Sequence, residues 1–426
     1  MKILVVGSGA REHAIARALS SDSTVHQVLV APGNPGTARI ATNLPVDPLD
    51  PDAVAALAVE HGVDLVVVGP EAPLVAGVAD AVRAAGVPCF GPGAEAARLE
   101  GSKAFAKEVM ASAAVPTAMA YVCSTLEEVA EALDAFGAPY VVKDDGLAAG
   151  KGVVVTSDRE EALAHAAACL GRSSVPGGER PAVVVEEYLD GPEVSLFCVC
   201  DGTDAVALAP AQDFKRLADG DTGPNTGGMG AYSPLPWAPE DLVEQVMERV
   251  ARPVVREMAR RGTPYTGVLY VGLALTSRGL RVVEFNARFG DPETQVVLAR
   301  LASSPAQLLH AAATGTLADV PPPRWRDESA VTVVVASEGY PGVCRLGDVI
   351  EGVAAAEELP GVHVLHAGCA TAEDGSLVSA GGRVLSVVGV GKDQEEARER
   401  AYAGVARISL AGSQHRTDIA LARAAQ

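Results

Sequence analysis

The sequence predicts an α/β protein that begins with a doubly wound parallel sheet. Two observations lead to this prediction: short β-branched runs alternate with helical segments over the first hundred residues, and glycine-rich or polar motifs follow the ends of the strands. A length of 426 residues, with 48% hydrophobic and 21% charged residues, is typical of a globular chain of roughly three domains. Ligands bind such sheets at the carboxyl ends of the strands.

The first region shows the alternation in order. We expect strands at 2–6, 25–30, 64–68 and 88–90, and helices at 11–19, 50–61 and 73–85. Most of the strand segments are nearly continuous runs of valine, leucine and isoleucine. Such runs indicate burial on both faces, as in a parallel sheet covered by helices.

A break near Gly101 begins the second region. Its expected helices are 102–113, 125–136, about 239–261 and 291–301, and its expected strands are 139–143, 152–156, 182–187, 193–200, 266–275 and 280–286. Residues 219–236 are rich in glycine and proline and are expected to form one long loop. Pro321–Pro323 mark a further boundary, after which we expect strands near 330–336, 363–367 and 383–390 and a helix near 393–410.

The charge composition limits the partners of the chain. Lys and Arg total 34 and Asp and Glu total 54, a formal net charge of −20, which opposes the basic surface that nucleic acids require. A locally positive site for an anionic small molecule is compatible with this charge. Only seven of the basic residues are lysines, and we expect Lys2, Lys107 and Lys392 to be solvated surface charges.

The cysteine and hydropathy patterns indicate a cytoplasmic protein. The seven scattered cysteines, an odd number without a CxxC pair, are expected to be free thiols in a reducing compartment. The chain opens directly into a strand, which leaves no room for a signal peptide. No apolar run reaches the ~18 residues that a membrane span needs.

The segment Gly7–Glu12 follows the first strand and opens the first helix. It has the first two glycines of a dinucleotide-binding fingerprint, but Glu12 stands where the third belongs, and Ala31 ends the second strand where an acidic residue would hold the ribose. A nicotinamide oxidoreductase is therefore disfavoured. What remains is a helix N-terminus with exposed amides suited to a phosphate or another anion, or else a plain tight turn.

A glycine-rich segment from Lys143 to Gly152 follows a strand and carries Lys151. Small residues let backbone amides approach phosphate oxygens, and the two lysines offset negative charge, so we expect a phosphate-binding loop. Gly152 replaces the Ser or Thr of a Walker A loop, which excludes that motif. The alternative is a flexible glycine hairpin. Asp144 follows Lys143 on the strand and is expected to face away from the phosphates, toward solvent.

Glu284 and Asn286 lie two residues apart on a predicted strand, so their oxygen side chains share one face. Hard oxygen ligands in this arrangement suit Mg²⁺ held jointly with substrate phosphates. The next residues turn into a helix, with Asp291 as the expected N-cap and Pro292 at the first helical position, and this turn would hold Arg288 near the metal face. The alternative is a capped turn that carries a surface arginine.

Residues Asp221–Gly230 form a polar, glycine-rich segment with many backbone donors. A linker is one interpretation. The Asn and Thr side chains make a substrate-facing loop at least as good an interpretation. No Ser/His/Asp or Cys/His arrangement can be read from the spacing of the chain, and the eight histidines show no metal-like cluster.

These motifs together resemble those of the ATP-grasp ligases and, within them, the phosphoribosylamine–glycine ligase family, also called glycinamide ribonucleotide synthetases. The resemblance runs nearly end to end and rests on Arg11–His13, Ala31–Asn34, Gly69–Leu74, Gly101–Lys103, Gly146–Gly152, Asp221–Pro234 and Phe285–Glu293. It implies an N-terminal Rossmann-like domain (1–101), a central two-part ATP-grasp unit (102–322, with a mobile subdomain at about 122–190) and a small C-terminal α/β domain (323–426).

The resemblance also implies a reaction. ATP, glycine and 5-phosphoribosylamine would give glycinamide ribonucleotide, ADP and phosphate through a glycyl phosphate, in purine biosynthesis. ATP and Mg²⁺ are the implied cofactors, with Mn²⁺ as an alternative metal. Glycine and 5-phosphoribosylamine are the expected partners, neither nucleic acid nor membrane is expected, and the expected state is a monomer or weak homodimer.

Residue roles carried over from the family are expectations of the same kind. The ATP-binding residues are expected to be Lys103, Lys143, Gly146, Ala149, Gly150, Lys151, Gly152, Glu186, Glu187, Tyr188, Leu189 and Glu193. The metal ligands are expected to be Glu284 and Asn286, and the residues of the chemistry Asp213, Lys215 and Arg288. The substrate-binding residues are expected to be Gly9, Asn34, Glu71, Asn225, Thr226, Gly227, Gly228, Arg288 and Asp291.

The chain departs from the family pattern at Asp144 and Phe214, and Phe214 casts doubt on proton transfer at its position. Two other functions fit part of the pattern. Another ATP-grasp enzyme, such as a carboxylase acting on a purine intermediate, would share the ATP and metal residues but not the N-terminal and 221–234 motifs. A nucleotide-binding module without catalysis would not need the metal ligands together with Arg288.

Overall fold

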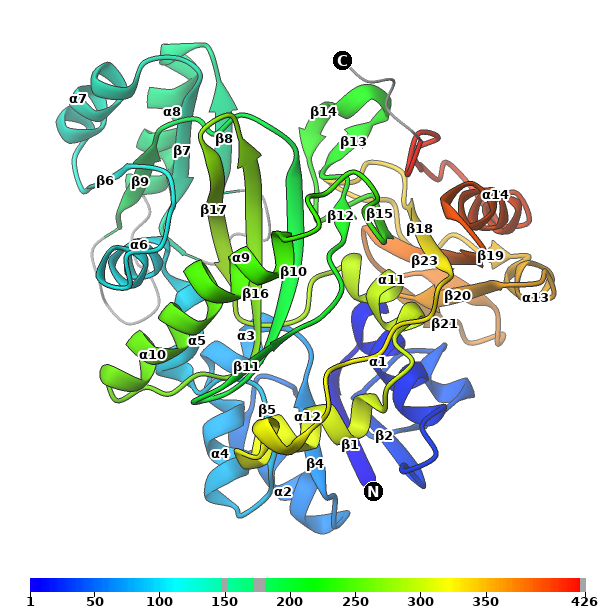
Figure 1. Ribbon diagram of the computed structural model, residues 1–426. Coiled ribbons are helices and arrows are strands. Elements are labelled where there is room, and N and C mark those ends of the chain that lie inside the picture. Colours follow the sequence, from blue (N-terminus) through cyan, green and yellow to red (C-terminus); the bar gives the residue numbers. More distant parts are fainter. Residues whose placement is uncertain (147–151, 172–180, 422–426) are drawn as a thin grey trace.

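A parallel sheet of five strands forms the N-terminal part of the chain (Figure 1, blue) in the computed structural model, which describes residues 1–146, 152–171 and 181–421. The strand order is β3-β2-β1-β4-β5 and every neighbouring pair is parallel, as the sequence predicts. The strands are β1 (Lys2–Gly7), β2 (Gln27–Pro32), β3 (Thr42–Asn43), β4 (Leu65–Val68) and β5 (Cys89–Phe90). The apolar residues of β1 and β4 are buried, which explains their unbroken hydrophobic sequence.

The connections of this sheet are α1 (Ala10–Ser20), the 3₁₀ turn η1 (Thr37–Arg39), α2 (Pro51–Glu60), α3 (Glu71–Val75) and α4 (Val78–Ala84). The predicted single helix at 73–85 is wrong, because Gly77 between α3 and α4 has a φ of +92°. This left-handed conformation is one that glycine tolerates and an α-helix does not contain. The first of the two helices, α3, begins at Glu71 shortly after β4, at the carboxyl edge of the sheet.

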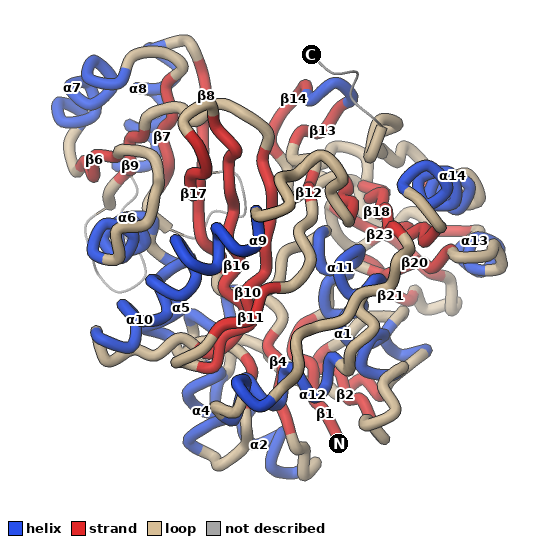
Figure 2. The backbone as a smooth tube through the Cα atoms, viewed as in Figure 1, coloured by secondary structure: helices blue, strands red, loops and turns tan. Residues whose placement is uncertain are grey.

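Two antiparallel sheets of four strands, named the central sheets because they come from the middle of the chain, stand side by side (Figures 1 and 2). One has the order β6-β9-β7-β8, with β6 (Ala120–Cys123), β7 (Tyr140–Asp144), β8 (Val153–Thr156) and β9 (Val183–Glu186). The other has the order β11-β10-β16-β17, with β10 (Glu193–Asp201), β11 (Ala205–Ala207), β16 (Thr266–Thr276) and β17 (Gly279–Asn286). The strands predicted from 139 to 286 are thus confirmed.

Helices flank these central sheets. They are α5 (Ala94–Gly101), α6 (Lys103–Ser112), α7 (Leu126–Phe136), α8 (Arg159–Leu170), α9 (Leu242–Val246) and α10 (Arg252–Arg260), with a π-helical turn η3 (Met247–Ala251) joining the last two. Ser102 caps α6 by accepting from the N–H of Phe105 at 3.1 Å. This cap fixes the start of the helix and hence the direction of Lys103, its first residue.

A further sheet of five strands, named the third sheet because most of its strands come from the third region of the chain, joins the central and last parts of the chain. Its order is β12-β15-β18-β23-β20, with β12 (Gln212–Asp213), β15 (Gly230–Ser233), β18 (Ser329–Ala336), β20 (Val362–His366) and β23 (Arg383–Gly391). The 3₁₀ turn η2 (Asp219–Asp221) lies in the hairpin of β13 (Arg216–Ala218) and β14 (Thr222–Asn225). The prediction of one long loop at 219–236 is therefore wrong. Its strand β15 pairs with β18, about a hundred residues further along the chain, so local composition could not reveal it.

Most of the remaining elements cover or extend this sheet, whereas the helix Pro305–Thr314 packs against β10 and β5. They are α11 (Glu293–Arg300), α12 (Pro305–Thr314), η4 (Leu317–Asp319), α13 (Val353–Glu357), α14 (Gln394–Val405) and the short pairs β19 (Ile350–Glu351) with β24 (Ser409–Leu410) and β21 (Cys369–Thr371) with β22 (Leu377–Ser379). The prediction that Asp291 is the N-cap of the helix and Pro292 its first residue is wrong, because α11 begins at Glu293 after Pro292. The Asp291 carboxylate instead accepts from Gln295 Nε2 at 2.7 Å.

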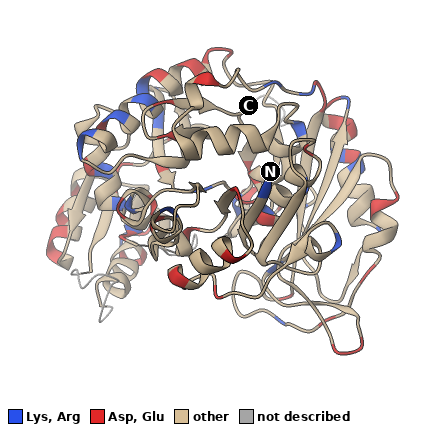
Figure 3. Ribbon diagram, turned by 90° about the horizontal axis from the view of Figure 1, so that it is seen from below, with Lys and Arg blue, Asp and Glu red and all other residues tan. Residues whose placement is uncertain are grey.

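Figure 3 shows acidic residues on many outer helices and loops rather than gathered on one face. All seven cysteines are free. No helix in the described part of the chain is both long and apolar enough to cross a bilayer.

Two histidines lie where the N-terminal sheet meets the third sheet. His13 on α1 and His366 at the end of β20 are 5% and 3% exposed, and their rings meet edge to face with centroids 5.7 Å apart. His13 Nδ1 accepts from the main-chain N–H of His366 at 2.9 Å, and Asn34 Nδ2 donates to the His366 carbonyl at 2.9 Å. Neither ring nitrogen of His366 has a hydrogen-bond partner among the described residues.

We expect acid to weaken this contact, and His366→Phe to reduce the effect. Burial lowers the pKa of His366 to about 4, against 6.5 in the unfolded chain, so the folded protein binds fewer protons and its stability falls as the pH drops below 6.5 toward 4. Phenylalanine fills similar space and cannot titrate. Thermal unfolding at about pH 7.5 and about pH 5 measures the effect, and an equal loss of melting temperature in both proteins contradicts it.

Candidate active site

A cleft of about 640 Å³ lies between the two central sheets and reaches the N-terminal and third sheets. Side chains from four parts of the chain line it: Glu71 after β4, Lys143 on β7, Glu284 on β17 and Arg383 at the start of β23. The cleft therefore collects residues that are more than 300 positions apart in sequence.

Lysines gather at one end of this cleft. Lys143 is 5% exposed and its Nζ lies 2.8 Å from Glu186 Oε2. Lys107 on α6 reaches the other oxygen of Glu186 at 3.1 Å, and Lys103 donates to the carbonyl of Gly146 at 2.9 Å. Two ammonium groups thus share the Glu186 carboxylate, and Lys103 lies near Lys143, so three lysines gather at this end of the cleft, an arrangement that suits phosphate groups.

Lys107 corrects a prediction, because it is not a solvated surface charge. Its side chain is 11% exposed, and besides Glu186 its Nζ contacts Thr117 Oγ1 at 2.9 Å and the Ala118 carbonyl at 3.0 Å. The sequence gives no sign of these partners, because an exposed lysine at the same position of a helix would have the same neighbours in sequence.

The glycine-rich segment after β7 is described only at its two ends. Gly146 and Gly152 line the cleft. The predicted ligands Ala149, Gly150 and Lys151 lie outside the described residues. The strand does continue through Asp144, but Asp144 is 3% exposed, so the prediction that it faces solvent is wrong.

The segment after β9 crosses from one central sheet to the other along the cleft. The N–H of Glu187 donates to the Met119 carbonyl at 3.0 Å, and its Oε1 accepts from the Met119 N–H at 3.1 Å. Tyr188 and Leu189 line the cleft next. Glu193 then begins β10, where its carboxylate pairs with Lys215. The predicted adenine and ribose residues therefore adjoin the lysine cluster.

The predicted metal ligands share a face of β17, as period-two geometry requires. Glu284 lies opposite Gly272 and Asn286 opposite Tyr270, and both line the cleft. An extra residue just before them, Val283, forms a β-bulge whose carbonyl accepts from Lys143 at 3.1 Å. Bulges re-aim neighbouring side chains and are frequent beside active sites.

Nearby cations keep Glu284 ionised. Desolvation in the cleft opposes ionisation, but Lys215 and Lys143 outweigh it and hold the pKa of Glu284 below its ordinary value. An ionised carboxylate and an amide oxygen on one face fit a hard cation such as Mg²⁺. The described part of the chain contains no group of three or more His, Cys, Asp or Glu side chains that could hold a metal ion.

Arg288 lies between two carboxylates, shortly after the strand face that carries Glu284 and Asn286. Its Nη2 lies 2.8 Å from Glu100 Oε1 and its Nε 3.3 Å from Glu71 Oε2. Arg11 approaches the same Glu71 oxygen at 3.9 Å. Glu100 also accepts from the Ala287 N–H at 2.7 Å, which fixes the turn that carries Arg288. Sequence reasoning missed Glu100 and Arg11 as parts of this network.

Asp213 and Lys215 line the cleft from β12 and the segment that follows. Desolvation, which Lys215 offsets only in part, raises the pKa of Asp213 to about 7. Phe214 between them also belongs to the lining of the cleft and is 8% exposed, with the guanidinium of Arg416 4.9 Å from its ring centroid. Phe214 therefore packs against the C-terminal segment, in line with the doubt about proton transfer at its position.

Three predicted substrate residues, Gly9, Asn34 and Gly228, do not line the cleft. The Gly9 N–H donates to the carboxylate of Glu12 at 2.6 Å, so this amide is not exposed for a phosphate as the sequence had suggested. Asn34 is 7% exposed. Its Nδ2 donates to the carbonyls of Ser8 and His366, and its Oδ1 accepts from the N–H groups of Gly36 and Thr37. Glu71, Asn225, Thr226, Gly227, Arg288 and Asp291 do line it, whereas Gly228 is buried behind them.

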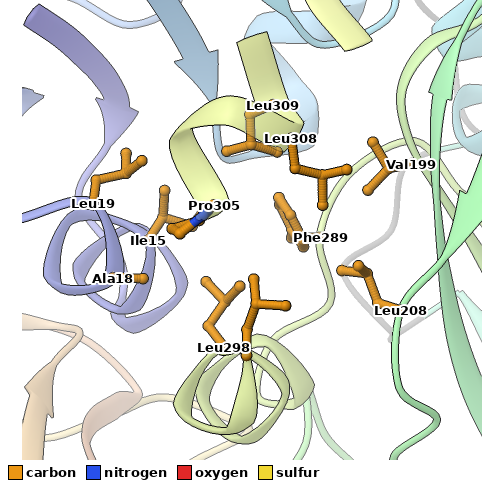
Figure 4. A pocket seen from close by; sticks show the side chains of 11 residues that line it. Ile15, Ala18, Leu19, Val199, Leu208, Phe289, Leu298, Pro305, Leu308 and Leu309 are labelled. Carbon is orange, nitrogen blue, oxygen red and sulfur yellow. The ribbon is translucent and has the colours of Figure 1, made fainter. Parts of the chain in front are cut away.

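A second cavity lies among α1, α11 and α12 and is lined wholly by apolar side chains, including Ile15, Phe289 and Leu308 (Figure 4). Its free space of about 10 Å³ is no more than one water molecule needs. We regard it as a packing gap in the core rather than a ligand site.

Solved structures with this architecture define the class of protein. The chain matches the biotin carboxylase domain of Hydrogenobacter thermophilus 2-oxoglutarate carboxylase with a TM-score of 0.73 at 18% identity, covering 97% of this chain and 91% of that chain. A likeness at this identity concerns the fold alone. The two central sheets and the cleft between them belong to the ATP-grasp class, and the family description of residues 101–294 states the same class.

The particular family follows from closer relatives. Residues 1–100, 101–294 and 330–422 match the N, ATP-grasp (A) and C domains of phosphoribosylglycinamide synthetase. The chain is 66% identical to phosphoribosylamine–glycine ligase of Streptomyces coelicolor over 99% of both chains, and 58% identical to that of Mycobacterium bovis over 100% of this chain and 99% of that one. It matches the Thermotoga maritima ligase structure with a TM-score of 0.85 at 33% identity, covering 98% of this chain and 100% of that chain. The chain belongs to the phosphoribosylglycinamide synthetase family.

Proposed function

We propose that the protein joins glycine to 5-phosphoribosylamine with ATP, giving glycinamide ribonucleotide, ADP and phosphate in purine biosynthesis. The observation that carries this proposal is that one cleft contains the lysine cluster around Lys143, the Glu284 face and Arg288. Family membership over the full chain supports the same reaction.

The proposed chemistry has two steps. The glycine carboxylate attacks the γ-phosphorus of ATP and ADP leaves, giving glycyl phosphate. The amine of phosphoribosylamine then attacks the acyl carbon, phosphate leaves and the nitrogen loses a proton. Neither step needs a strong side-chain nucleophile, so the protein has to neutralise charge, align the groups and exclude water. This agrees with a site built from cations and carboxylates.

The lysine end of the cleft is proposed to hold ATP. Lys103 and Lys143 would contact its phosphates, with the glycine-rich segment from Gly146 to Gly152 over them. The Glu186–Leu189 segment would read adenine chiefly through backbone groups, and Glu193 would hold the ribose. The lowered pKa of Glu284 and its position beside these lysines support Glu284 and Asn286 as ligands of Mg²⁺, or of Mn²⁺ as the alternative ion. The metal would neutralise phosphate charge.

The neighbouring part of the cleft is proposed to hold glycine and phosphoribosylamine. Arg288, Asp213, Lys215, Asp291 and the Asn225–Gly228 segment would face glycine or the acyl phosphate. Their common position on the cleft lining supports this, apart from Gly228. Glu71 would face phosphoribosylamine, and Gly9 and Asn34 would act by shaping the loops beside it, since their polar groups are already bonded within the protein.

Other parts of the proposal rest on composition and resemblance. The division into residues 1–101, 102–322 and 323–426 follows the family layout, although the third sheet crosses the last boundary through β12 and β15. Free cysteines support a cytoplasmic location. A monomer or weak homodimer is the proposed state.

ADP release measured with each substrate omitted in turn tests the function. We expect ADP only when Mg²⁺, glycine and phosphoribosylamine are present together, because the amine must trap the acyl phosphate for turnover to continue. Bicarbonate in place of glycine serves as the control for the carboxylase alternative. Equal ADP release with bicarbonate would overturn the proposal.

A further inference from the structure

Arg383 connects the third sheet to two separate segments of the cleft. It begins β23, and its Nη1 donates to the carbonyl of Gly227 at 2.5 Å and to that of Asp291 at 2.8 Å. Its Nη2 lies 3.1 Å from the Asp291 carboxylate. Gly227 and Asp291 are 64 residues apart in sequence (291 − 227), so this one guanidinium sets their mutual position.

A guanidinium is suited to this task and an ammonium is not. Its five N–H donors lie in one rigid plane and can reach several acceptors in fixed directions. Lysine carries one donor atom at the end of a flexible stem and could keep the charge opposite Asp291 without holding both carbonyls.

Tyr340 forms a second hydrogen bond with the backbone of Gly227. Its hydroxyl accepts from the Gly227 N–H at 2.9 Å, while Arg383 takes the Gly227 carbonyl. Both backbone hydrogen-bonding groups of Gly227 thus end on side chains of the C-terminal region. The neighbouring residues Asn225 and Thr226 line the cleft.

The packing explains why residue 227 is a glycine. A Cβ there would lie 3.1 Å from Arg383 Cζ and 3.2 Å from its Nη2, closer than ordinary carbon contacts. The φ of Gly227 is outside the left-handed region, so the backbone itself would accept alanine. The close approach of Arg383 is what a methyl group at this position would disturb.

We propose that Arg383 is a positioning residue through which the C-terminal region holds the Asn225–Gly228 segment and Asp291 against the glycine end of the cleft. The identity of glycine as the substrate there rests on the proposed function. The residues of the ATP end, Lys143 and Glu186, belong to other elements and make no contact with Arg383. Loss of Arg383 should therefore affect glycine and leave ATP binding almost unchanged.

Arg383→Ala is expected to lower kcat/KM for glycine by about 100-fold, the size of effect that a misplacement of about 1 Å produces, while KM for ATP changes less than about threefold. Arg383→Lys should recover only part of the loss. Arg345→Ala is the matched control, because Arg345 pairs with Glu338 and Asp348 within the same region and does not reach the cleft. A loss that falls equally on glycine and ATP, or equally on the control, would overturn the proposal.

Gly227→Ala supplies a second variant that leaves Arg383 in place. We expect it to lower kcat/KM for glycine about tenfold in the wild-type background and less than about twofold in the Arg383→Ala background, because the methyl group then meets no guanidinium. Equal losses in both backgrounds would show that Gly227 and Arg383 act independently, against the proposal.

Hydrogen exchange separates this inference from the proposed function. In the free protein, amide exchange over residues 225–228 should rise at least about tenfold in Arg383→Ala and stay unchanged in Arg345→Ala. This readout needs no substrate. If the wild type failed to release ADP with glycine and phosphoribosylamine, the proposed function would fall while the exchange result stood; unchanged exchange in Arg383→Ala would remove the positioning role itself.

Discussion

Replacing Glu284 by alanine is expected to lower turnover by about 100-fold or more, the typical loss for one preorganised electrostatic group. The variant removes the ionised carboxylate of the proposed metal face, while Asn286 alone offers only a neutral oxygen. Lys103, Lys143 and Lys215 would then face one another with less opposing charge. Turnover measured across a range of Mg²⁺ concentrations should show a loss that is largest at low Mg²⁺.

Two further variants separate charge from shape. Glu284→Gln keeps the size of the side chain and should lose nearly as much turnover as alanine, because the charge is the feature that a hard cation requires. Glu248→Gln makes the same change on the exposed π-turn η3, outside the lining of the cleft, and should leave turnover unchanged. Near-normal turnover of Glu284→Gln at low Mg²⁺ would rule out the metal assignment.

Arg288→Met should damage both stability and activity. Arg288 is the cation between Glu100 and Glu71, and removing one partner of a buried ion pair costs about 3–5 kcal/mol because the remaining charge is left unpaired. Turnover should also fall by about 100-fold or more if the guanidinium stabilises charge on the reacting groups. Chemical unfolding and ADP release measure the two effects.

The double variant Arg288→Met, Glu100→Gln separates them. Burial already raises the pKa of Glu100, so neutralising this side chain should restore much of the lost stability. Turnover should not return, because the proposed contact with substrate is still missing. Recovery of both quantities together would mean that Arg288 serves the fold alone.

The N-terminal sheet could be predicted from the sequence because its signals are local. Unbroken apolar runs such as Leu65–Val68 indicate strands buried on both faces, and short helical segments between them require a parallel sheet. The two-residue strand β3 was not predicted. The prediction of one helix in place of α3 and α4 failed at Gly77, whose left-handed conformation is permitted but not demanded by its sequence.

Part of the candidate site could also be predicted, because its signal in the sequence is local. Glu284 and Asn286 are two residues apart on one strand, so period-two geometry places them on one face whatever surrounds them. The bulge at Val283 lies before this pair and leaves their spacing intact. The resemblance to ATP-grasp ligases rested on contiguous motifs of the same local kind, and the comparisons with known proteins confirm it.

Contacts between distant segments could not be predicted from the sequence. Nothing around Lys107 reveals that Glu186 lies beside it, and the glycines of 219–236 gave no sign of a strand that pairs with β18. The burial of Asp144 was misjudged for the same reason, since alternation along a strand gives the direction of a side chain but not what covers it.

The fold class, the family and the two-residue face of the proposed metal site follow from the amino-acid sequence alone. Two long-range contacts emerge only from the packing of distant segments: Arg383 reaches Gly227 across 156 positions, and His366 reaches His13 across 353. Periodicity and capping depend on neighbours within a few residues, whereas these partners meet only in the folded chain. A hydrogen bond between such distant residues leaves no spacing that a single sequence can display.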